Sequence, residues 1–202
     1  MFKAILISML CLLFCACATL PAPTSQLHYM SWQQRQQQLQ TIQNFNISGT
    51  MSLAYAGQNS IMHFSWQQSP DNFTINLSSL IGIGGIKITG NKQQVTLWKS
   101  ATEKVTAKTP EALMQSQLGW SMPIHDVRYW VIGLPAPDSP YKAKFDRYNH
   151  LSVLKQRGWV IQYIDWQVVN NVDLPRTILL TGPQLQAKIT LSPQFSLKSY
   201  IF

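Results

Sequence analysis

The chain has 202 residues and a formal net charge of +8, and its 16 lysines and arginines are scattered without a run of three. A nucleic-acid-binding protein would gather such charge into a patch and usually carry a recognisable motif, so we expect no nucleic acid partner. Scattered positive charge favours acidic proteins or anionic lipid head groups instead.

Residues 1–16 have the pattern of a signal peptide for export. Lys3 provides a positive charge, residues 5–14 are almost entirely apolar, and small Ala16 precedes a predicted cleavage site. The apolar run is only half of the ~20 residues that a helix needs to cross a bilayer, so we exclude it from the fold. We expect this segment to be removed.

The cysteines indicate a lipid anchor. All three, Cys11, Cys15 and Cys17, lie in the first 17 residues, so the mature domain is expected to have no disulfide. Cys17 resembles the acylated cysteine of a bacterial lipoprotein signal; the alternative is a secreted protein with incidental cysteines in its signal peptide. Two or more acyl chains would give stable anchoring. Ala18, in place of the Asp that retains such lipoproteins in the inner membrane, indicates the outer membrane.

A lipidated tether and one domain are predicted for the mature chain. Residues 17–30 contain two prolines and small polar residues without periodicity, as a flexible tether would. Residues 31–202 are enough for one domain with a substantial core.

The domain is expected to begin with a helix. Ser31 and Gln34 fit a capping box, and apolar Trp32, Leu39 and Ile42 fall on one helical stripe. The glutamine-rich residues 33–38 are interpreted as the solvated face of this helix.

Apolar residues then alternate with polar ones, which predicts antiparallel strands separated by turns. A helical insertion interrupts them: Thr109 and Pro110 start one helix, which ends at Gly119, and a second opens at Pro123 and stops near residue 133. About six strands precede the insertion, at residues 45–55, 62–66, 73–77, 86–88, 95–97 and 105. About five follow it, at residues 151–153, 159–163, 178–180, 185–191 and 195–197.

This order indicates a mainly β fold with helices, of the α+β class: one curved antiparallel sheet of about eleven strands with helices on one side. So many strands could close into a barrel or leave an open one with a wide interior.

Signals for enzymatic chemistry are weak. His28, His63, His125 and His150 are far apart in the sequence, and we expect them to have surface or capping roles. No metal-ligand or nucleophile motif occurs, and the glycines of residues 82–85 precede a strand instead of the helix that a phosphate loop requires. We therefore predict no catalytic residue, no metal site and no cofactor.

The loop at residues 80–84 is the most unusual segment. Leu80, Ile81 and Ile83 stand between two predicted strands, where a hairpin normally places polar residues. The loop tip could fold under a helix or extend the strand. Alternatively, these three side chains form an exposed apolar wedge that contacts a membrane or a protein.

Several segments together resemble the LolB family of outer-membrane lipoprotein receptors, and they span nearly the whole mature chain. The most specific is the run Trp-Val-Ile-Gly-Leu-Pro-Ala-Pro at residues 130–137. The others are Trp32-x-x-Arg35 with Leu39, Phe64-Ser65-Trp66-Gln67-Gln68, Leu80-Ile81-Gly82, Leu118-Gly119-Trp120 with Met122-Pro123, Gln156-x-Gly158-Trp159, and Leu174-Pro175.

The resemblance implies an open, unclosed antiparallel β-barrel with an α-helical lid and an internal hydrophobic cavity. It implies that the cavity accepts the acyl chains of lipoprotein cargo from the periplasmic carrier LolA, and that the protein inserts this cargo into the outer membrane. The chain would be a monomer anchored on the periplasmic side of that membrane. Ile81 takes the place of the family's membrane-inserting leucine, with Leu80 where proline is frequent, so either residue could insert.

Seven apolar residues are candidates for the cavity lining, although each could equally be ordinary core. They are Phe64, Trp66, Phe73, Ile75, Ile124, Tyr129 and Trp130. An anchored outer-membrane scaffold protein without transfer activity remains the alternative function.

Overall fold

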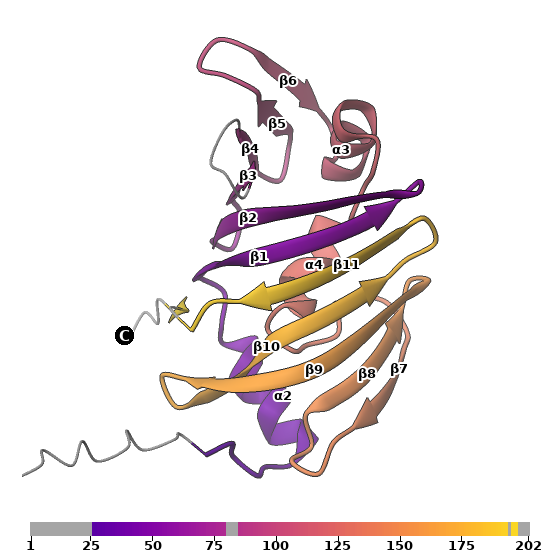
Figure 1. Cartoon of the computed structure of the whole chain (residues 1–202). Helices are drawn as coiled ribbons and strands as arrows, with labels where there is room; N and C mark the ends of the chain where they lie inside the picture. The colour runs from indigo at the N-terminus through magenta and orange to yellow at the C-terminus, as the bar shows by residue number, and fades with distance from the viewer. Residues whose placement is uncertain (1–25, 80–84, 194, 198–202) are drawn as a thin grey trace, which may run out of the picture.

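One curved antiparallel sheet dominates the computed structural model, which describes residues 26–79, 85–193 and 195–197 (Figure 1). Three helices accompany it in the described chain: α2 (Trp32–Gln40), α3 (Pro110–Leu118) and α4 (Ile124–Trp130). The strands are β1 (Phe45–Tyr55), β2 (Gln58–Gln68), β3 (Phe73–Ser79), β4 (Gly85–Gly90), β5 (Val95–Trp98), β6 (Lys104–Ala107), β7 (Tyr141–Phe145), β8 (Leu151–Gln156), β9 (Trp159–Val169), β10 (Val172–Thr181), β11 (Leu185–Leu191) and β12 (Ser196–Leu197).

The sheet is open, as expected from the resemblance. Its strand order is β6-β5-β4-β3-β2-β1-β11-β10-β9-β8-β7, and the short β12 pairs with β1. β6 and β7 therefore form two edges that do not pair with each other. Pairing of β1 with β11 joins the strands before the helical insertion to those after it.

Strand β7 is the element that the sequence did not reveal. Its residues follow the pattern exposed, exposed, half-buried, exposed, exposed, so only Ala143 turns toward the core. Lys142 and Lys144 keep this edge polar, which hinders pairing with another chain. The sequence of such an edge strand lacks the alternation of apolar and polar residues by which the other strands were predicted.

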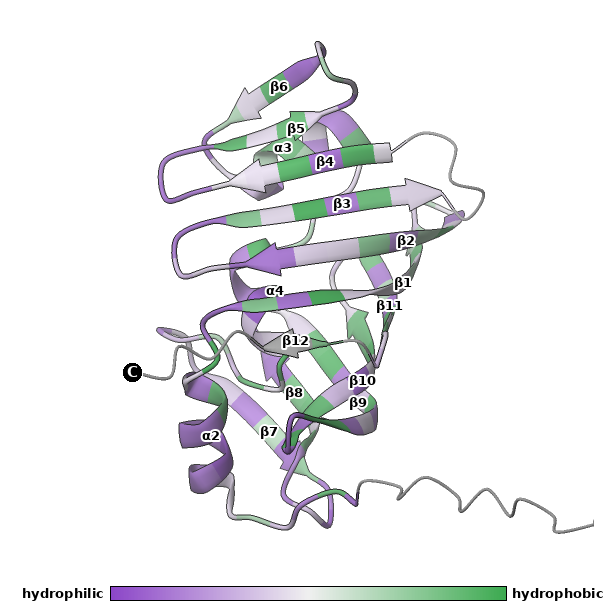
Figure 2. Ribbon diagram, turned by 90° about the vertical axis from the view of Figure 1, so that its left-hand side faces the viewer, coloured by the Kyte–Doolittle hydropathy of each residue, from purple (hydrophilic) through white to green (hydrophobic). Residues whose placement is uncertain are grey.

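Helices α3 and α4 cover the inner face of the sheet (Figures 1 and 2). Figure 2 shows apolar residues alternating with polar ones along β3 and β4. On β3 the apolar set is Phe73, Ile75 and Leu77, all buried, and it packs in one core with Leu113 of α3 and Val127 of α4. Burial of one face fixes the register, because a one-residue slip would expose the whole apolar set.

Two of the predicted helix starts are formed as expected. The backbone N–H of Gln34 donates to Ser31 Oγ (3.3 Å), and the backbone N–H of Ser31 donates to Gln34 Oε1 (3.0 Å), which completes the capping box of α2. Thr109 Oγ1 accepts from the backbone N–H of Ala112 (3.2 Å) at the start of α3, which ends at Gly119 in the left-handed conformation. None of the helices in the described residues is long and apolar enough to span a membrane.

Candidate functional site

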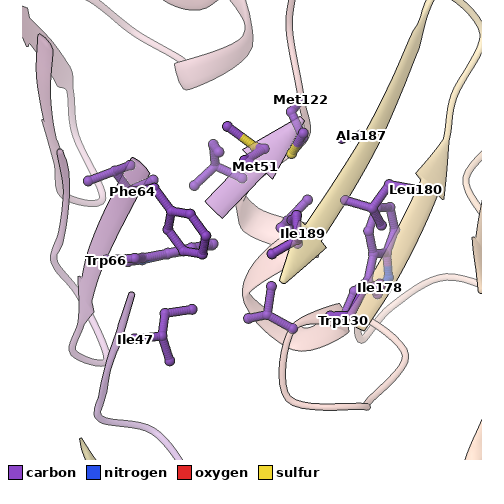
Figure 3. Close-up of a cluster of buried hydrophobic side chains, with 14 of the residues drawn as sticks. Ile47, Met51, Phe64, Trp66, Met122, Trp130, Ile178, Leu180, Ala187 and Ile189 are labelled. Carbon is purple, nitrogen blue, oxygen red and sulfur yellow. The ribbon is translucent and has the colours of Figure 1, made fainter. Parts of the chain in front are cut away.

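A small apolar cavity of about 40 Å³ lies between the inner face of the sheet and the helical insertion. The sheet contributes Met51, Phe64, Trp66, Ile75, Leu77, Ile88 and Ile189, and the insertion contributes Met114, Trp120, Met122, Ile124, Val127 and Val131. Figure 3 shows Phe64 and Trp66 on one side of this core, with Ile189 and Met122 opposite. Every lining side chain is apolar, so the space is suited to hydrocarbon.

Four of the seven predicted cavity residues line this space, namely Phe64, Trp66, Ile75 and Ile124. The other three lie outside it in this structure, and contact of any of the seven with an acyl chain stays a prediction. Phe73 is buried against Gly90, and Tyr129 is half-buried with the Arg128 guanidinium 5.0 Å from its ring centre. Trp130 is fully buried, with its ring centre 6.1 Å from that of Trp159.

The remaining lining residues include some that a fuller use of the sequence pattern could have found. Leu77 and Ile88 continue the alternation of apolar and polar residues that identified Ile75. Their positions in this alternation already indicated that they face the inner side of the sheet. Met114, Trp120 and Met122 belong to the insertion, where no strand period shows which side chains face the sheet. The predicted loop residues Leu80, Ile81 and Ile83 and the predicted acylation site Cys17 lie outside the described residues.

The cavity is too small for a long ligand. Pockets for drug-sized ligands have volumes of about 300–1,000 Å³, far above the 40 Å³ found here. A long alkyl chain can therefore enter only if the helical insertion or the lining side chains move.

The α4 half of the insertion is held by polar contacts. The buried side chain of Gln156 accepts from Trp130 Nε1 (3.0 Å) and from the backbone N–H of Ala136 (2.9 Å), and its Nε2 donates to the Ala136 carbonyl (2.8 Å). The Tyr163 hydroxyl donates to the carbonyl of Trp130 (3.1 Å). These contacts fix α4 and the segment that follows it to strands β8 and β9.

The α3 half is held differently. Within the described chain, the side-chain hydrogen bonds of α3 residues and its N-cap are all local, to partners in or next to the helix. Its attachment to the sheet is apolar packing, with Leu113 and Met114 buried in the core. Since no long-range hydrogen bond must break, α3 is the half of the insertion that can be displaced at lower cost.

A second cluster, of charged side chains, lies on the other side of the core beside α2. Asp173 is buried, and its carboxylate contacts Arg35 Nη1 (3.3 Å), His150 Nε2 (2.9 Å) and His28 Nδ1 (2.7 Å). His150 also lies 2.9 Å from Asp146 and stacks on Trp166. Arg35 Nη2 donates to the carbonyl of His28 (2.8 Å), so the cluster attaches the chain before α2 to strand β10.

This cluster corrects two predictions. The expected surface or capping role is wrong for His150, whose side chain is fully buried. The solvated face predicted for residues 33–38 is wrong at Arg35, which is also fully buried. The pair of His150 and Asp173 lines neither the apolar cavity nor four further pockets of the described chain, and both side chains are fully buried. Its role is structural.

Asp173 should make the folded state sensitive to acid. Burial alone would raise the pKa of Asp173, but hydrogen bonds with His150 and His28 and the charge of Arg35 hold it below its ordinary value of 3.8. Such a carboxyl contributes stability that is complete above the unfolded pKa and is lost as pH falls through the folded pKa. We expect the free energy of unfolding, measured in urea, to decline below about pH 4. The decline should be shallower in Asp173→Asn, and equal slopes would contradict this assignment.

Solved structures share the fold at very low sequence identity. A DUF1329 family protein from Desulfovibrio piger superposes with a TM-score of 0.55 at 7% identity, covering 85% of this chain and 92% of its own. A LolA superfamily protein from Nitrosomonas europaea superposes with a TM-score of 0.52 at 9% identity, covering 84% and 94%. The open sheet with its helical insertion is thus an architecture of known proteins.

Sequence similarity is much closer to one family. Residues 43–193 match the family described as outer membrane lipoprotein LolB. An outer-membrane lipoprotein LolB from Coxiella burnetii is 42% identical over 190 residues, which cover 93% of this chain and 90% of that protein. Another from Nitrosococcus oceani is 34% identical over 188 residues, covering 93% of each. With an open twelve-stranded sheet and an apolar cavity beneath its insertion, this chain belongs to the LolB family.

Proposed function

We propose that the apolar cavity holds the acyl chains of lipoproteins in transit. As a LolB family member the chain is a non-enzymatic outer-membrane lipoprotein of the periplasmic face, and it receives lipoproteins from LolA and inserts them into the outer membrane. The observation that carries the cavity assignment is the lining itself: thirteen side chains, all apolar, from both the sheet and the insertion. Packing alone holds α3 over this space, so the site can open without breaking long-range hydrogen bonds.

The energetics favour such a site. Each CH₂ group moved out of water contributes about 0.8 kcal/mol, so an acyl chain binds by burial alone. Transfer can then run downhill, from carrier to cavity to bilayer, if each successive site binds the chains more tightly. A scaffold protein without transfer activity would not need an apolar cavity that can open.

Transfer is the direct test. The lipidated protein is placed in liposomes and mixed with a complex of LolA and a labelled lipoprotein, and the label is followed into the membrane. We expect the label to move only when the protein is present. A folded protein that leaves the cargo on LolA would favour the scaffold function.

We propose that the loop at residues 80–84 makes the membrane contact, as its three large aliphatic side chains suggest. At about 1.5–3 kcal/mol for each fully buried aliphatic, a single charge in this loop should remove much of the gain from insertion. Ile81→Glu should therefore keep uptake from LolA and the urea midpoint but lose delivery to liposomes. The matched control is Asn59→Glu in exposed β2 sequence, which should deliver normally. Normal delivery by Ile81→Glu would contradict the proposed membrane contact of this loop.

We further propose that acylated Cys17 and residues 17–30 tether a domain that works as a monomer. The position of the cysteine after the signal pattern supports the anchor. The mass of the mature protein tests whether Cys17 is acylated. Sedimentation in detergent tests whether the protein is a monomer.

A further inference from the structure

Trp120 borders the small apolar cavity and two surface grooves. The first groove, of about 660 Å³, is lined by Tyr55, Trp159 and Leu185 among others. The second, of about 630 Å³, is lined by Ile61, Leu77 and Leu118 among others. Trp120 lines the cavity and both grooves, whereas Leu77 lines the cavity and the second groove but not the first.

Trp120 sits in the connection between α3 and α4, at a point where the backbone can turn. Gly119 before it has a φ of +78°, and Pro123 follows three residues later as the N-cap of α4. The ring is almost buried, at 8% exposure, and its centre lies 6.5 Å from that of Tyr55. The side chain thus lies on the α3 side of the insertion by position and belongs to the core by burial.

The indole ring is held by packing alone. Trp66 and Trp130 each donate their indole N–H to a glutamine side chain, of Gln68 and Gln156 respectively. No hydrogen bond from the indole of Trp120 to another protein group is found among the described residues, and its nitrogen is not one of the buried atoms that lack a partner. Rotation of this ring therefore costs apolar contacts but breaks no hydrogen bond.

We propose that Trp120 is a gate, meaning that its ring closes the cavity and that acyl chains pass it between groove and cavity. This inference rests on the proposed function. Each groove has the volume of an ordinary ligand site of about 300–1,000 Å³, so an acyl chain can lie in a groove before the cavity opens. The second groove also includes Ser79 and Gly85, the two residues that flank the loop at 80–84, so it leads toward the proposed membrane contact.

Both grooves have mixed linings of polar and apolar residues, and they differ in the segments that they reach. Glu111 and Gln115 of α3 border the first groove, together with Trp159 at the start of β9 and the turns after β1 and before β11. The second groove is bordered by exposed Ile61 and by Met62 and Ile86. Because the second groove includes the residues that flank the loop at 80–84, we assign it to acyl chains that leave for the bilayer.

The test uses a fluorescent polyene fatty acid and the full-length protein in detergent-free nanodiscs. Stopped-flow mixing gives the association and dissociation rates, and titration gives the affinity. A gate lies on the path both ways, so Trp120→Ala should raise both rates, by about tenfold if the lost ring contacts are those of a typical aromatic pair. The affinity should change much less than the rates. Trp120→Phe, which keeps an aromatic ring, should fall between Trp120→Ala and the unchanged protein.

The control variant is Trp98→Ala, because Trp98 lies on the outer face of β5 and lines neither the cavity nor the two grooves. Its rates should match those of the unchanged protein. Unchanged rates in both folded Trp120 variants, with normal binding by the parent protein, would overturn the gate and leave the cavity assignment standing. Absence of fatty acid binding by the parent protein would overturn the cavity assignment and the gate with it.

Discussion

Asp173→Asn is expected to lower the free energy of unfolding by about 3–5 kcal/mol at neutral pH, the cost of removing one partner from a buried ion pair. Both Asp173 and Arg35 have fully buried side chains, so loss of the carboxylate charge leaves a guanidinium in the core without its counter-ion. The same change weakens the contacts of His150 and His28. The effect is therefore larger than that of a surface ion pair.

Urea denaturation followed by circular dichroism measures this loss. The control is Asp165→Asn, because Asp165 faces Arg176 at 3.8 Å with both side chains more than half exposed. Exposed pairs contribute about 0–1 kcal/mol, so the control should unfold near the midpoint of the unchanged protein. Equal losses of unfolding free energy in the two variants would show that the buried Asp173 cluster stabilises the fold no more than an exposed ion pair does.

Gln156→Ala is expected to cost at least about 3 kcal/mol, because each buried polar group that loses its partner costs about 1–3 kcal/mol. One amide side chain here satisfies the indole N–H of Trp130 and both backbone groups of Ala136. Its loss would release the α4 half of the insertion, which the structure holds by polar contacts. We therefore also expect greater exposure of the apolar cavity to a hydrophobic dye.

The matched control is Gln162→Ala on neighbouring β9, since Gln162 is exposed on the outer face of the same sheet. Its urea midpoint and its dye binding should stay close to those of the unchanged protein. If Gln156→Ala unfolds at the same urea concentration as this control, Gln156 does not hold the insertion in place.

The strands were predictable wherever one face of the sheet is buried, because such a strand has an apolar residue at every second position. β1 and β3 follow this rule along their length, with apolar side chains at alternate buried positions. β7 does not, since its edge position leaves both faces largely exposed. The helix starts were predictable for a different reason: the caps at Ser31 and Thr109 are made by residues three apart in the chain.

The site was only partly predictable because its parts meet through long-range contacts. The alternation of apolar and polar residues placed Phe64, Trp66 and Ile75 on the inner face of the sheet. It could not show which of these side chains border empty space. The charged cluster is harder still, since Arg35 and Asp173 lie 138 residues apart and no local pattern links them. Trp120 stands in a connection between helices, where neither helical nor strand periodicity applies.

His28 limits how far the anchored domain can stand from its membrane. Its contacts with Asp173 fix the chain beside α2 and the start of β10, whereas β3 and β4 lie in the upper half of the molecule in Figure 1. With Cys17 acylated as proposed, residues 17–28 can span at most about 40 Å even when fully extended. The domain can therefore reorient about its lipid anchor but stays within that distance of it, which confines its work to carriers that already stand close to the membrane surface.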